Sequence, residues 1–125
     1  MRRRCVARHG RTPGRVTGLS ASAAVRKEVV LSFRAPGTDG NRPPPARGYL
    51  VKQSTSPITD LRSFRRAQTL CNGTCRFPAT RVGEQIKLRI TDLRPNRTYY
   101  YAVAARDNVS GRLGPRSEPV RIRTR

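Results

Sequence analysis

Short runs of alternating apolar and polar residues fill the chain from residue 16 to its end. The clearest case is residues 85–91, where every second side chain is apolar and the others are polar or charged. A strand with this pattern turns one face to a core and the other to water. Runs of this kind predict seven strands, at residues 16–22, 28–34, 48–54, 64–70, 85–91, 98–106 and 120–124.

Segments rich in glycine, proline, asparagine and aspartate separate these runs and predict turns. The longest, at residues 35–45, ends in three consecutive prolines. We expect it to be an unpaired loop, because proline lacks the N–H that a sheet needs. No stretch has the period of a long amphipathic helix. The pattern therefore predicts an all-β fold, a seven-stranded antiparallel immunoglobulin-like β-sandwich.

Composition divides the chain into two parts. Residues 1–15 are rich in arginine and glycine without periodicity, which predicts a basic flexible N-terminal arm. Residues 16–125 carry the strand pattern, and their length suits one domain with one modest core. No run approaches the roughly 18 apolar residues of a membrane-spanning helix. We therefore expect a monomeric module that does not insert into a membrane.

The run Leu93-Arg94-Pro95-Asn96-Arg97-Thr98-Tyr99 opens the longest predicted strand. It resembles the L-x-P-x-T-x-Y corner of fibronectin type III domains, and the resemblance extends over residues 13–124. Arg97 stands where that family often has threonine. Pro95 pre-sets the turn, and Tyr99 offers a ring to the core and a hydroxyl to a backbone partner across the corner. Leu93, Pro95 and Tyr99 are thus predicted to form the structural corner of the sandwich.

The resemblance implies a non-catalytic module, acting as a spacer or as a protein or carbohydrate interaction domain of an exported or cell-surface protein. Residues suited to catalysis are scarce. The only histidine, His9, lies in the predicted arm, and the seven carboxylates are scattered singly along the chain. No nucleophile stands beside a base, as acid–base catalysis requires. The sequence predicts no enzyme, no cofactor and no metal site.

Cys71 and Cys75 flank the dipeptide Asn-Gly, which favours a tight turn. Such a turn brings the two thiols close enough for a disulfide, which forms in an oxidising compartment. Free thiols or half of a zinc site are the alternatives, although the remaining cysteine, Cys5, and His9 lie in the arm and complete such a site poorly. The disulfide interpretation favours an extracellular or cell-surface location, as part of a longer chain.

The charge of the chain is strongly positive, with 27 Lys and Arg against 7 Asp and Glu, a formal +20. A field of this strength attracts polyanions and weakens with salt. The alternative function is therefore a basic domain that binds nucleic acid or acidic glycan. Because the arginines are spread along the chain, we expect weak, non-specific polyanion binding at most.

Loops collect at the two ends of a sandwich of this kind. Three of them, at residues 35–46, near residue 81 and at 108–115, are expected to share one end. Family members often contact partners there, as the resemblance implies. The candidate binding residues are accordingly Arg42, Arg81 and Arg112, with a protein or polysaccharide surface as the partner.

Overall fold

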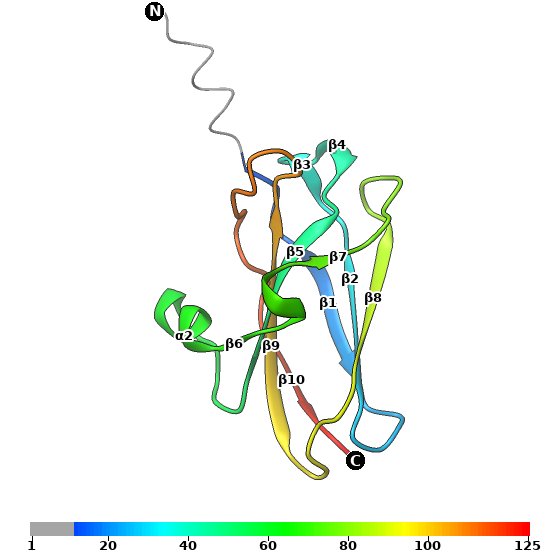
Figure 1. The fold of residues 1–125 in the computed structure, drawn as a ribbon, viewed down its shortest axis with the longest axis vertical. Coiled ribbons are helices and arrows are strands. Elements are labelled where there is room, and N and C mark those ends of the chain that lie inside the picture. Colours follow the sequence, from blue (N-terminus) through cyan, green and yellow to red (C-terminus); the bar gives the residue numbers. More distant parts are fainter. Residues whose placement is uncertain (1–11) are drawn as a thin grey trace, which may run out of the picture.

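Two antiparallel β-sheets pack face to face in the computed structural model, which describes residues 12–125 (Figure 1). The first sheet has the order β1 (Thr17–Ser22), β2 (Val29–Arg34), β8 (Gln85–Ile90). The second has the order β10 (Val120–Arg123), β9 (Thr98–Arg106), β5 (Gly48–Ser54), β6 (Gln68–Thr69), and β7 (Cys75–Arg76) also pairs with β5. This architecture is an antiparallel immunoglobulin-like sandwich.

Six of the seven predicted strands are confirmed, each with bounds within one residue of the prediction. Their alternation also holds. Val29, Leu31 and Phe33 of β2 point into the core at 0–1% exposure. Opposite them, the ring of Tyr49 lies edge-on to that of Phe33, with 5.0 Å between centroids. The core therefore lies between the sheets, as the two-residue period predicts.

The segment at residues 35–45 is not an unpaired loop, which corrects the prediction. It forms a hairpin of β3 (Gly37–Asp39) and β4 (Arg42–Pro45), in which Gly37 pairs with Pro45. The hairpin turns at Gly40, whose φ of 63° suits glycine. Prolines lack a donor but keep their carbonyl acceptors, so a short edge hairpin tolerates them.

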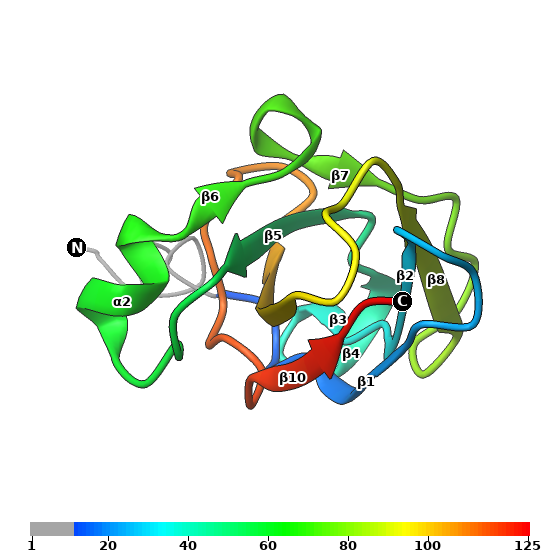
Figure 2. The same cartoon turned by 90° about the horizontal axis from the view of Figure 1, so that it is seen from below.

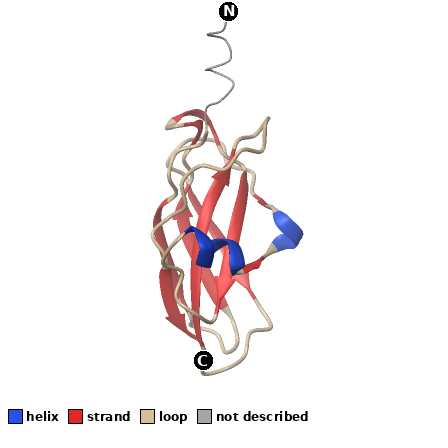
Figure 3. Cartoon of the chain, turned by 90° about the vertical axis from the view of Figure 1, so that its left-hand side faces the viewer, coloured by secondary structure: helices blue, strands red, loops and turns tan. Residues whose placement is uncertain are grey.

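The segment predicted as a strand at residues 64–70 is also corrected. Its first half belongs to a short helix, α2 (Leu61–Arg66), and only Gln68–Thr69 is strand. Asp60 caps the helix, because its carboxylate accepts a hydrogen bond of 2.8 Å from the Ser63 N–H. The helix lies across the outer face of the five-stranded sheet (Figure 3).

A second apolar cluster lies under α2. Phe64 and Ala67 pack there against Leu50, Ala102 and Ala104, whose side chains lie on the outer face of the sheet. Although Ala102 and Ala104 lie on the outer face, they are buried at 0–1% exposure. The helix therefore adds a third, partial layer on the outer face of the two-layer sandwich.

Lys52 attaches α2 to the sheet. Its ammonium donates hydrogen bonds to the carbonyls of Arg65 and Ala67 at 3.2 and 3.1 Å and to the Thr69 hydroxyl at 2.8 Å. It also lies 5.9 Å from the ring centroid of Phe64. Burial lowers the pKa of Lys52. The side chain satisfies carbonyls at the C-terminal end of the helix, which is a structural task.

The predicted N-terminal arm, residues 1–15, lies largely outside the described residues, and so do Cys5 and His9. Its last four residues, 12–15, contact the sandwich. Pro13 forms a β-bridge with Gly40, and the Gly14 N–H donates to the Gly40 carbonyl at 3.0 Å. Within residues 12–125, no helix is long and apolar enough to cross a membrane.

Candidate functional site

Three segments gather at one end of the sandwich, the β3–β4 hairpin, the turn at residues 80–84 and the loop at residues 107–114 (Figure 1). Hydrogen bonds join the first and the last. The Thr38 hydroxyl donates to the Asp107 carboxylate at 3.1 Å, and the Asn108 amide donates to the Pro45 carbonyl at 3.0 Å. The turn at residues 80–84 contacts the base of the hairpin, where the Gly83 N–H donates to the Ala35 carbonyl at 2.8 Å. We call these segments the loop end.

Each predicted binding arginine lies on a different segment of the loop end. Arg42 begins β4, Arg81 lies in the turn before β8, and Arg112 lies in the loop after β9; all three are exposed. The structure thus brings together the segments that carry them, as expected from the topology. Their role as binding residues stays a prediction.

Two carboxylates shape these turns. Asp107 accepts hydrogen bonds from the N–H groups of Ser110 and Val109, and the bond from Ser110 is the main reason that the pKa of Asp107 is lowered. Glu84 accepts from the Thr80 N–H at 2.8 Å, which likewise lowers the pKa of Glu84. Both carboxylates serve turn geometry and do not form an acid–base pair.

A hollow of about 340 Å³ lies beside the loop end, and three arginines line it. Gly48 pairs with Arg76 on one side and Arg106 on the other, so the two arginines lie on neighbouring strands across this glycine. Arg47 completes the lining. The sequence did not reveal this cluster, because strand pairing brings together residues that are far apart along the chain.

The disulfide between Cys71 and Cys75 is present, with 5.1 Å between Cα atoms. It closes the crossover from β6 to β7, which contains the short 3₁₀ turn η1 (Cys71–Gly73). Asn72 takes a φ of 55°, as an Asn-Gly turn predicts. Cys71 is exposed and Cys75 is buried at 2% exposure. The prediction of a disulfide is confirmed over free thiols or a zinc half-site.

Hydrogen bonds join the two sides of the turn before β9. Tyr99 is buried, and its hydroxyl accepts a hydrogen bond of 3.1 Å from the Arg94 N–H. Leu93 is buried beside it at 6% exposure, and Pro95 lies in the turn between them. The Thr124 hydroxyl donates to the Arg94 carbonyl at 2.6 Å. The corner therefore also joins the end of the chain to the turn at residues 91–97.

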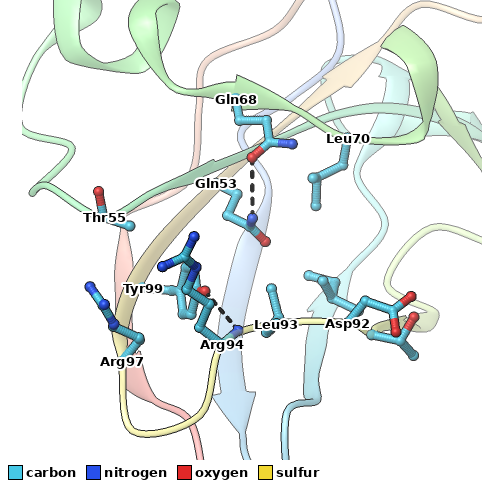
Figure 4. A pocket seen from close by; sticks show the side chains of 11 residues that line it. Gln53, Thr55, Gln68, Leu70, Asp92, Leu93, Arg94, Arg97 and Tyr99 are labelled. Atoms are coloured by element: carbon cyan, nitrogen blue, oxygen red, sulfur yellow. Dashed lines mark hydrogen bonds between the residues drawn. The ribbon is translucent and has the colours of Figure 1, made fainter.

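A cleft of about 510 Å³, which we call the side cleft, lies against this corner (Figure 4). Gln53, Gln68 and Leu70 form one wall, and the turn at residues 91–97 forms the other, with Arg94 and Arg97. Tyr99 lies between the walls (Figure 4). Seen from below, this turn runs from β8 of the first sheet to β9 of the second (Figure 2). No sequence motif marks the side cleft, because its walls come from three separate stretches of the chain, residues 53–55, 68–70 and 90–99.

Within residues 12–125, no group of three or more His, Cys, Asp or Glu side chains is placed to hold a metal ion. What the structure offers instead is a rigid sandwich with arginine-lined hollows, an arrangement suited to binding anions.

The fold and these hollows define an immunoglobulin-like β-sandwich module. No family model matches the chain, and no curated protein matches it. Among solved structures, it is similar to the chain described as titin kinase and its flanking domains, with a TM-score of 0.49 and 19% sequence identity over 89% of this chain. This chain spans about 17% of the length of that one. Similarity at this level carries no information on function.

Proposed function

We propose that this chain is a non-catalytic module of the fibronectin type III kind that serves as a spacer or interaction domain of an exported or cell-surface protein. The corner carries the proposal, because the Tyr99 hydroxyl bonds to the Arg94 N–H across the turn. That contact is typical of such sandwiches. The fold alone is compatible with many roles.

The location is supported by the Cys71–Cys75 disulfide. Disulfides persist outside the reducing cytosol and are rare within it. The interaction role is supported by the loop end, where hydrogen bonds hold the hairpin against the loop at residues 107–114. A rigid scaffold that presents exposed loops is a common basis for partner binding. In this proposal Arg42, Arg81 and Arg112 contact the protein or polysaccharide partner.

A salt series with duplex DNA separates this function from that of a polyanion-binding domain. For a module whose charge is only a general surface property, we expect binding to disappear near roughly 150 mM salt. Replacing Arg42, Arg81 and Arg112 with glutamine is compared with replacing Lys87, Arg121 and Arg123, which removes the same charge elsewhere. We expect the two triple variants to weaken binding equally.

Two results would contradict the proposal and favour the polyanion function. One is tight DNA binding that persists at roughly 150 mM salt, with a salt dependence that corresponds to several neutralised phosphates. The other is a larger loss of DNA affinity in the loop-end variant than in the control variant. The slope of log affinity against log salt concentration would then be smaller by about 3 in the loop-end variant. The first would favour a polyanion-binding domain, and the second would place the nucleic-acid site at the loop end.

A further inference from the structure

The side cleft continues beyond its main volume. A second hollow of about 250 Å³ shares Gln53, Thr55, Gln68 and Tyr99 with it and reaches Arg66, the last residue of α2. Because they share these residues, the two hollows form one groove that runs beside the edge strand β6 from the turn at residues 91–97 to Arg66. That turn lies at the opposite end of the sandwich from the loop end (Figure 1). A groove of this form suits a segment of a chain molecule, whereas a small ligand is usually enclosed by a pocket.

Three guanidinium groups line this groove. Arg66, Arg94 and Arg97 are exposed, and within residues 12–125 no hydrogen bond or ion pair engages their side chains. Asp92 lies at the opposite end from Arg97 (Figure 4). A guanidinium presents parallel N–H groups that match the two oxygens of a carboxylate. The part of the groove that these arginines line is therefore suited to binding carboxylates.

The two glutamines add donors rather than acceptors. The Gln53 carbonyl oxygen accepts from the Tyr101 hydroxyl at 2.8 Å, and the Gln68 carbonyl oxygen accepts from the Gln53 amide at 3.4 Å. The Gln68 NH₂ group has no partner among the described residues. The side-chain hydroxyls of Thr55 and Thr91 also line the groove. Its polar side chains thus offer N–H donors and hydroxyls, with Asp92 at one end.

This polarity favours a sugar chain over a peptide. A peptide carries an N–H donor at almost every residue, and donors that find no acceptor in the groove weaken binding. A sugar hydroxyl both donates and accepts, so it adapts to a donor-rich wall. The apolar side chain of Leu70, which is partly exposed, lines the same space and suits the C–H face of a sugar ring. Tyr99 is only 6% exposed and offers no platform for stacking nucleic-acid bases.

We propose that the groove binds a segment of a carboxylated glycan, with Arg94 and Arg97 holding the carboxylate of one sugar unit and Arg66 that of a further unit. Gln68 and the threonine hydroxyls bind the sugar hydroxyl groups. The site does not depend on the loop end, so it stands or falls separately from the function proposed above.

The test uses the full chain and a tetramer of galacturonate, titrated by calorimetry at roughly 150 mM salt. We expect one tetramer to bind per chain, and the fully methyl-esterified tetramer not to bind, because esterification removes the charge and keeps the sugar skeleton. The double variant Arg94→Gln, Arg97→Gln should weaken binding tenfold or more. The control Lys87→Gln, Arg121→Gln removes equal charge outside the groove and should change affinity less than about twofold.

Chain length provides a second readout. Free galacturonate should bind more weakly than the tetramer, and Arg66→Gln should reduce that difference. Equal affinity for the monomer and the tetramer would overturn the assignment to a chain. Equal or tighter binding of hexaglutamate or of an oligothymidylate would overturn the assignment to a glycan. Equal loss in the groove and control variants would overturn the site itself.

Discussion

At the residue scale, each buried tyrosine hydroxyl has a partner. The Tyr49 hydroxyl donates to the Ala46 carbonyl at 2.8 Å, and Tyr101 donates to Gln53. Burial raises the pKa of both Tyr49 and Tyr101, because a phenolate is poorly solvated between the sheets. Partnered hydroxyls allow these rings to fill the core without leaving a polar atom unsatisfied.

Replacing Tyr99 with phenylalanine tests the corner. The ring stays, but the Arg94 N–H loses the hydroxyl that accepts its hydrogen bond. We expect the free energy of unfolding to fall by about 1 kcal/mol, the net contribution of such a bond. Urea denaturation measures the change. Tyr100→Phe is the matched control, since Tyr100 lies half-buried on the outer face; an equal loss in both variants would contradict the role of the corner.

Asp107 makes the local stability of the loop end depend on pH in the acid range. Its folded pKa is lowered mainly by the Ser110 N–H, so the stabilisation is present above the ordinary aspartate pKa and is lost as pH falls through the folded value. We expect the protection of the Val109 and Ser110 amides, measured as the exchange rate relative to the intrinsic rate at the same pH, to fall below about pH 4. In Asp107→Asn this protection should be low at neutral pH and should not change further in acid. An unchanged acid response in that variant would assign the effect to another group.

At the element scale, α2 depends on few contacts. Phe64 is its one buried residue, whereas Leu61 is 59% exposed on the same helix. We expect Phe64→Ala to lower the free energy of unfolding by about 3 kcal/mol, because it leaves a cavity against Ala102 and Ala104. Leu61→Ala should cost less than about 0.5 kcal/mol. Denaturation of both variants checks the difference, and similar losses would show that the helix is not held by its buried face.

The elements that the sequence predicted are those with a strong two-residue period. The runs at residues 85–91 and 98–106 became β8 and β9 with their expected faces. α2 was missed because six residues give too little length for a helical period to be recognised. The spacing of Asp60 and Ser63, which form a capping box, was its available signal.

The β3–β4 hairpin and the side cleft were missed for other reasons. Three consecutive prolines argue against a strand, because proline has no N–H to donate. The short β3–β4 hairpin pairs Gly37 with Pro45 nonetheless, since it requires few N–H donors from the strand that carries the prolines. The cleft depends on tertiary contacts, since β-sheet pairing places Gln53 beside Gln68 and the corner sets Arg94 opposite them. The corner itself was predictable because its residues are close in sequence.

At the scale of the whole molecule, the formal charge of +20 acts on folding as well as on binding. Like charges on a compact domain repel one another more strongly than in the expanded unfolded chain. Few carboxylates offset them, and the Arg89–Glu28 pair at 2.9 Å is exposed on its arginine side. Such a pair contributes at most about 1 kcal/mol. The net electrostatic effect on stability is therefore expected to be unfavourable at low salt.

Screening should consequently stabilise the fold. Raising sodium chloride from about 20 to about 500 mM shortens the Debye length from roughly 20 Å to less than about 5 Å, so repulsion between distant arginines is largely removed. We expect the melting temperature, followed by circular dichroism, to rise by several degrees. Glucose of equal osmolarity is the control, because it screens no charge. A melting temperature that falls with salt would show that attractive pairs, rather than repulsion, dominate the surface.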